Sequence, residues 1–97
     1  MKKPDRNTVS QLDALPNIGK AGMADLNLLG IKYPKELIGK DAFELYDELC
    51  ITTGVRHDPC VIDVFLSVID FMQGGEVKPW WAFTEERKQR YESRYND

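Results

Sequence analysis

The segment from Cys60 to Met72 constrains the fold most, because it is apolar on nearly every side. Its β-branched residues would also suit a buried strand. A segment of about fourteen residues, counted with the residues that flank it, is however longer than most strands and favours a buried helix. Asp58 is a favoured N-cap residue and Pro59 a favoured first residue, so we predict a helix from Asp58 to about Met72. Gly74 follows as a break. A helix of this kind has to lie at the centre of its fold.

The remaining apolar residues also recur at helical spacing, without useful alternating runs. Asp41 is expected to cap a helix that ends at Gly54, and Thr84 to begin a helix that reaches Tyr95. We therefore predict an all-α fold, a compact bundle of about five helices that contains a helical hairpin. It should form one domain over residues 1–97, with flexible ends at 1–7 and 92–97.

The hairpin is predicted from the turn Leu15–Lys20. Pro16 ends a helix that begins near Thr8, because a proline forces the preceding residue out of the α region. Gly19 can adopt positive φ without strain, and Asn17 visits the left-handed region readily. A second helix then starts beside Lys20. The first amides of a helix have no intrahelical acceptor, so they can bind a phosphate.

This pattern resembles a helix-hairpin-helix motif, which has hydrophobic, glycine, hydrophobic and glycine residues followed by leucine or isoleucine seven positions later. Ile18, Gly19 and Leu26 match the motif, and Asn17 replaces its first glycine. Such motifs bind the phosphodiester backbone without reading sequence, through hairpin amides and a basic residue. The resemblance implies a DNA-binding site at Asn17, Ile18, Gly19 and Lys20. The alternative is an ordinary hairpin of two helices with no ligand.

Three segments together resemble a bacterial family of helix-hairpin-helix proteins, the pathogenicity-locus or mitomycin-resistance family. They are Leu15–Ala21, Arg56–Val61 and Lys78–Thr84, and the resemblance runs from about residue 9 to about residue 90. It implies a bacterial origin, a helix-hairpin-helix fold and a link to DNA damage tolerance or mitomycin resistance. It implies no reaction.

Charge is distributed unevenly along the chain. Residues 1–40 hold seven lysines and arginines against four acids, whereas residues 41–77 hold one against eight. The positive excess therefore lies on the hairpin segment, as backbone binding requires, but it is small and predicts weak binding. The chain has no run of 18 apolar residues and no apolar leader, so we expect a cytoplasmic protein without a membrane partner.

Cys50, His57 and Cys60 are the residues most typical of metal chemistry, because thiolates and imidazoles bind zinc. A structural zinc site needs four ligands, and the chain has two cysteines and one histidine. An alternative is a thiol activated by His57 near the start of the Cys60 helix. We predict no metal, no cofactor and no catalytic residue.

Two other groups admit a structural or a functional interpretation. Asp63 and Asp70 lie within the apolar helix, where carboxylates need partners, and Arg56 or an arginine near the C-terminus can supply one. Trp80 and Trp81 could stack on bases, but the favoured interpretation is that their rings hold the segment after Gly74 against the core.

The leading hypothesis is a non-catalytic module that binds DNA backbone without sequence specificity through the hairpin. The alternative is a helical adaptor that binds another protein and has little or no DNA affinity. An enzyme that uses Cys60 or a metal ranks third.

Overall fold

The computed structural model describes residues 5–95, and every regular element within them is helical. This confirms the predicted all-α class. No helix in this part of the chain is long and apolar enough to span a membrane. In chain order, the elements are the 3-10 helix η1 (Leu12–Ala14), α1 (Lys20–Leu28), the 3-10 helix η2 (Pro34–Leu37), α2 (Ala42–Thr53), α3 (Cys60–Met72), the 3-10 helix η3 (Trp80–Phe83) and α4 (Thr84–Tyr95).

The described chain has four α-helices, so the expected count of about five is not confirmed. The difference lies at the N-terminus, where a helix was expected from Thr8 to Leu15. The amides of Thr8 and Val9 instead donate to the Asp5 carbonyl at 3.1 and 2.9 Å, which closes a separate turn. Only η1 fits between this turn and Pro16, because so short a segment cannot offset the cost of nucleating an α-helix.

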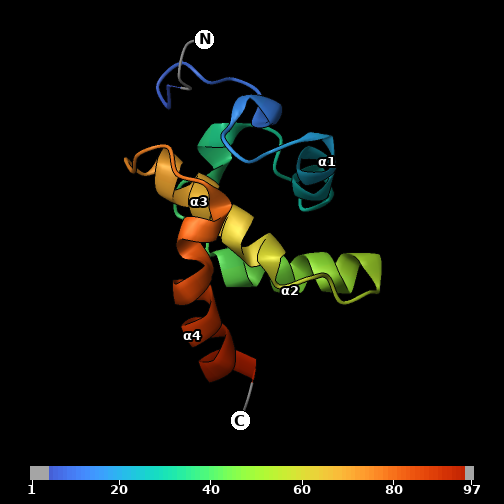
Figure 1. The fold of residues 1–97 in the computed structure, drawn as a ribbon. Coiled ribbons are helices and arrows are strands. Elements are labelled where there is room, and N and C mark those ends of the chain that lie inside the picture. Colours follow the sequence, from blue (N-terminus) through green and yellow to red (C-terminus); the bar gives the residue numbers. More distant parts are fainter. Residues whose placement is uncertain (1–4, 96–97) are drawn as a thin grey trace.

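The central helix of the fold is α3, as its apolar sequence predicts. Ile62, Phe65 and Val68 are at most 1% exposed. Figure 1 shows α3 crossing the middle of the molecule, with η1 and α1 towards one end and α2 and α4 towards the other. The Asp58 carboxylate accepts a hydrogen bond from the Cys60 amide at 2.8 Å and so caps the helix where the sequence predicted.

Predicted caps also bound α2. The Asp41 carboxylate accepts hydrogen bonds from the amides of Phe43 and Glu44 at 2.8 and 3.2 Å. Gly54 ends the helix in the left-handed conformation, with φ of 73°, and its amide donates to the Cys50 carbonyl at 2.9 Å. The apolar faces of α2 and α3 then join the hairpin side chains in one continuous core.

A close backbone approach follows α3 and requires a glycine. A Cβ atom at Gly75 would lie 1.9 Å from Asp70 Oδ2 and 2.9 Å from the Asp70 carbonyl oxygen. The Asp70 Oδ2 atom is itself buried without a hydrogen bond, although the side chain as a whole is 40% exposed. Its nearest cation is Lys78, whose Nζ lies 4.0 Å away.

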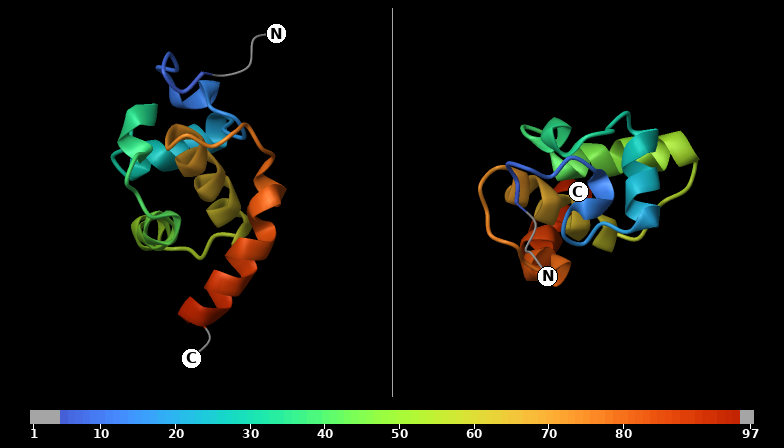
Figure 2. Two further views of the ribbon diagram at one scale, coloured as in Figure 1. Left: turned by 90° about the vertical axis from the view of Figure 1, so that its left-hand side faces the viewer. Right: turned by 90° about the horizontal axis from the view of Figure 1, so that it is seen from above.

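A buried ion pair joins α4 to α3. Asp63 is fully buried, and its Oδ1 accepts a hydrogen bond from Arg87 Nε at 2.8 Å. Its Oδ2 accepts a second one from the Thr84 hydroxyl, also at 2.8 Å. The partner of Asp63 is therefore an arginine near the C-terminus, one of the two sources expected from the sequence. Figure 2 shows α4 continuing from this region beyond the rest of the molecule.

Residues near both described ends contact the body of the protein. Arg6 Nε donates to the Phe71 carbonyl at 2.8 Å, and Arg6 Nη2 donates to the Gly75 carbonyl at 2.5 Å. The Tyr95 hydroxyl donates to Asp47 at 2.5 Å. The expectation of flexible ends at 1–7 and 92–97 falls partly on residues 1–4 and 96–97, which lie outside the described residues.

Replacement of Arg87 by methionine should lower the free energy of unfolding by about 3–5 kcal/mol, because the carboxylate of Asp63 then stays buried without its cation. The double variant Asp63→Leu/Arg87→Met removes both charges and should recover much of this loss. Urea denaturation at neutral pH measures the three free energies. Equal losses in the single and double variants would contradict the role given to the pair.

Candidate nucleic-acid interface

The turn between η1 and α1, which we call the hairpin turn, contains one left-handed residue. Because η1 is a three-residue 3-10 helix, the predicted hairpin of two α-helices is not confirmed. Asn17 has φ of 68°, as its residue type predicts. Gly19 has φ of −101° and ψ of −166°, which is extended, so it does not use the positive φ that glycine permits. The chain reverses at Asn17 instead. Asparagine is one of the few residues other than glycine that tolerate this conformation.

The Asn17 side chain fastens the turn to two distant parts of the chain. Its Nδ2 donates to Ser67 Oγ at 3.1 Å and to the Lys78 carbonyl at 2.8 Å. Ser67 is buried on α3, and its hydroxyl donates to the Val64 carbonyl at 2.7 Å. The side-chain amide nitrogen of Asn17 is therefore hydrogen-bonded within the protein, and these bonds position the hairpin turn.

Ile18 anchors the turn from the inside. Its side chain is 6% exposed, and its amide donates to the Leu15 carbonyl at 3.4 Å. A Cβ atom at Gly22 would lie 3.4 Å from Ile18 Cδ1, so the first turn of α1 packs closely over this side chain. Of the four residues predicted to bind DNA, Ile18 is thus buried, whereas Asn17 is exposed but directs its side-chain amide towards Ser67 and Lys78.

Gly19 and Lys20 face the other way. Gly19 is exposed, and a Cβ atom built on it meets no atom within 4 Å. Lys20 is exposed as the first residue of α1, which has no side-chain cap. The first bond of the helix is donated by the Met23 amide to the Gly19 carbonyl at 3.0 Å.

Four successive amides consequently remain free at this end of α1. In the part of the chain that the structure describes, no acceptor is hydrogen-bonded to the amides of Gly19, Lys20, Ala21 or Gly22. We call these four amides, together with the exposed side chain of Lys20 at the first position of α1, the hairpin amide cluster. Donors in this arrangement, at the positive end of a helix dipole, suit a phosphate oxygen.

Lys78 lies next to the hairpin turn, although no motif in the sequence indicates this. Its carbonyl accepts the Asn17 bond although 61 residues separate the two positions. The Lys78 ammonium lies 5.6 Å from the centre of the Phe83 ring, besides its approach to Asp70. No local sequence pattern predicts the contact between Asn17 and Lys78, because it depends on how the segment after α3 packs against the hairpin turn.

Cys50, His57 and Cys60 do not converge. The His57 ring nitrogen Nε2 is hydrogen-bonded to the Thr53 hydroxyl at 2.8 Å, and the His57 amide approaches Cys50 Sγ at 3.5 Å. Within residues 5–95, no group of three or more histidine, cysteine, aspartate or glutamate residues could hold a metal ion. A hydrogen bond to Asp58, with partial burial, raises the pKa of the Cys60 thiol above its usual value. This is the opposite of an activated thiol.

The two tryptophans differ in their surroundings. Trp80 is partly buried, whereas Trp81 is 63% exposed. Their rings meet edge to face, with centres 5.5 Å apart. Since η3 packs against α3, the predicted anchoring of the segment suits Trp80. Trp81 stays available to a partner.

Comparison with known proteins places this small all-helical chain in a family. The family described as Cdd1, pathogenicity locus, matches residues 5–89. The mitomycin resistance protein McrB of Streptomyces lavendulae is 35% identical over 79 residues, which cover 81% of this chain and 75% of that protein. No solved structure matches the chain. The chain belongs to the pathogenicity-locus family, as its resemblance predicted.

Two substitutions of Asn17 separate the effect of its left-handed backbone from that of its side-chain hydrogen bonds. Asn17→Gly should lower the free energy of unfolding by about 1 kcal/mol, because it keeps the left-handed turn and loses the side-chain hydrogen bonds. Asn17→Ala should cost about 1–3 kcal/mol, since it adds strain at positive φ. Thermal and urea unfolding of the two variants measure the difference. A glycine variant less stable than the alanine variant would contradict the observed turn.

The raised pKa of Cys60 predicts slow alkylation at neutral pH, because only the thiolate reacts. In a Cys50→Ser variant, the rate at which iodoacetamide alkylates Cys60 should rise with pH and should reach half its maximum at a pH above the usual thiol pKa. A rate that is already maximal at neutral pH would show an activated thiol and revive the enzymatic hypothesis.

Proposed function

We propose that this protein is a non-catalytic helix-hairpin-helix module that binds DNA backbone without sequence specificity. The observation that carries the proposal is the hairpin amide cluster, in which four unpartnered amides adjoin the exposed Lys20. Backbone amides contact phosphate oxygens, which are the same at every base pair, so such contacts carry no sequence information.

Rigidity of the turn supports this role. Asn17 is hydrogen-bonded to Ser67 of α3 and to the Lys78 carbonyl, and Ile18 is buried in the core. The turn is therefore fixed, and the amides of the hairpin amide cluster need little ordering when a ligand binds. Preorganised donors bind more tightly than mobile ones because less conformational entropy is lost. The open space beside Gly19 leaves room for a phosphate to approach the backbone.

The proposed affinity is low and depends only weakly on salt. The chain has a net charge of −3, and the acids of residues 41–77 oppose any long-range attraction to DNA. Few phosphates can be neutralised at one hairpin, which limits the release of counterions. The similarity to a mitomycin resistance protein favours a place in DNA damage tolerance or resistance to that compound.

The charge of Lys20 is tested with fluorescently labelled duplexes of unrelated sequence at low salt. Lys20→Glu should weaken binding to all of them about equally and reduce the slope of log affinity against log salt by about one. Lys88→Glu on α4 is the matched control, because this exposed lysine undergoes the same change of charge outside the hairpin. Equal effects of the two substitutions would indicate a diffuse charge effect and remove the hairpin from the interface.

Gly19→Val tests the amides separately from the charge. The extended φ and the open surroundings of Gly19 predict that the variant folds, with a loss of about 1 kcal/mol or less at this capping position. The added side chain should hinder approach of a phosphate and lower DNA affinity. Full affinity in a folded Gly19→Val protein would contradict the proposed contact.

The second candidate function is a protein-interaction adaptor, which an exposed apolar groove favours. Ile51 and Val55 are 79% and 57% exposed at the end of α2. They line an open pocket together with Tyr46, Asp47, Cys50, Gly54, Arg56 and Tyr95. Exposed apolar patches often bind other proteins. Absence of duplex binding at low salt, with partner binding lost on Ile51→Lys, would favour this function over the first.

A further inference from the structure

We propose that an open pocket between α2 and α4 is an anion site that takes a phosphate group. The pocket has a volume of about 400 Å³ and is lined by Phe43, Gln89, Arg90, Ser93 and Arg94. It involves none of the residues of the hairpin amide cluster. The proposal therefore goes beyond the proposed function and stands or falls independently of it.

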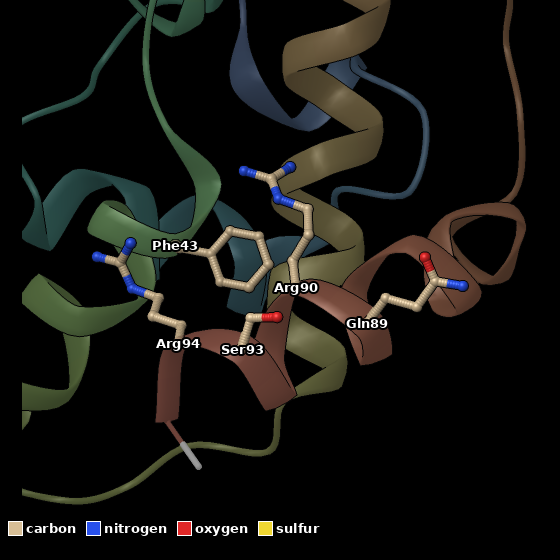
Figure 3. Close-up of a pocket in the computed structure, with 5 residues that line it drawn as sticks. All are labelled: Phe43, Gln89, Arg90, Ser93 and Arg94. Carbon is tan, nitrogen blue, oxygen red and sulfur yellow. The ribbon is translucent and has the colours of Figure 1, made fainter. Parts of the chain in front are cut away.

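Two guanidinium groups share one aromatic ring in this pocket. The Cζ atoms of Arg90 and Arg94 lie 4.5 and 5.8 Å from the centre of the Phe43 ring. Figure 3 shows the two guanidinium groups on different sides of that ring. The arginines are four residues apart on α4, which places them on the same face of the helix. Phe43 itself is 1% exposed, so it provides a fixed support for both cations.

Each arginine is also held by one carboxylate. Arg90 Nη1 contacts Glu86 Oε2 at 2.9 Å, and Arg94 Nη2 contacts Asp47 Oδ2 at 2.9 Å. A guanidinium has five N–H donors, so a single contact of this kind leaves further donors for a ligand. Neither carboxylate lines the pocket.

The polar groups that do line the pocket are suited to donate hydrogen bonds. They comprise two guanidinium groups and the Ser93 hydroxyl, whereas the Gln89 amide points away from the Phe43 ring (Figure 3). Arginine binds phosphate oxygens in a planar, often bidentate geometry, and the support of Phe43 reduces the side-chain entropy lost on binding. These features favour a phosphate group, whether free or carried by a nucleic-acid strand.

The test is a titration of the protein with inorganic phosphate at constant ionic strength, followed through the arginine Nε–Hε signals in NMR spectra. Signals of Arg90 and Arg94 should shift, and Arg90→Gln or Arg94→Gln should weaken binding about tenfold or more. Lys88→Gln is the matched control on the same helix and should leave the affinity unchanged. No shift of either arginine signal, or an equal loss in the control, would overturn the proposal.

Glu86→Gln gives a test in the opposite direction that does not depend on the arginine variants folding. It frees Arg90 from an exposed ion pair at little cost to stability and should strengthen phosphate binding. Unchanged or weaker binding in this variant would count against the site. Addition of a short DNA duplex to the phosphate complex then shows whether the site prefers free phosphate or the phosphate of a nucleic-acid strand. Displacement of phosphate from the arginines identifies the ligand as nucleic-acid backbone, and retention identifies it as free phosphate.

Discussion

The fold depends on the burial of α3, a helix that is apolar on nearly every side and holds a fully buried carboxylate. Burial of the apolar side chains is favourable, but the charge of Asp63 is costly unless it is paired. Arg87 and Thr84 provide its partners from α4, so the same contact that satisfies the charge also fixes the C-terminal helix. The arginines further along α4 are thereby carried to the Phe43 side chain.

The hairpin depends on the same helix through a smaller contact. Ser67, on α3, and the carbonyl of Lys78 both accept hydrogen bonds from the Asn17 side chain. The turn is therefore positioned by tertiary structure as well as by its own residues. As a result, Gly19 and Lys20 are presented outward while Ile18 stays in the core. A module whose donors are held in this way needs no rearrangement to receive a phosphate.

Local patterns predicted the four α-helices of the described residues, but also an N-terminal helix that is absent. Asp41, Gly54 and Asp58 act as caps in the structure because capping depends on residues within one turn of the helix end. The N-terminal segment departs from prediction, since the turn at Asp5 leaves too little chain for an α-helix before Pro16.

The contacts that decide the candidate sites could not be predicted in the same way. The sequence indicated that Asn17 tolerates a left-handed turn, but not that its amide reaches a carbonyl 61 residues away. Likewise, nothing in the sequence around Arg90 and Arg94 indicates which aromatic ring they meet, and only the packing of α4 beside α2 brings them to Phe43. These contacts depend on how the helices pack, which periodicity does not specify.

The proposed function requires that phosphate oxygens of DNA contact the amides at the start of α1. The most direct measurement is a titration of the isotopically labelled protein with a duplex of arbitrary sequence at low salt, followed by amide proton and nitrogen chemical shifts. If the hairpin binds DNA, the largest changes should occur at the amides of Gly19, Lys20, Ala21 and Gly22 and should recur with a second, unrelated duplex. Changes confined to Ile51 and Val55, or none at the hairpin, would contradict it.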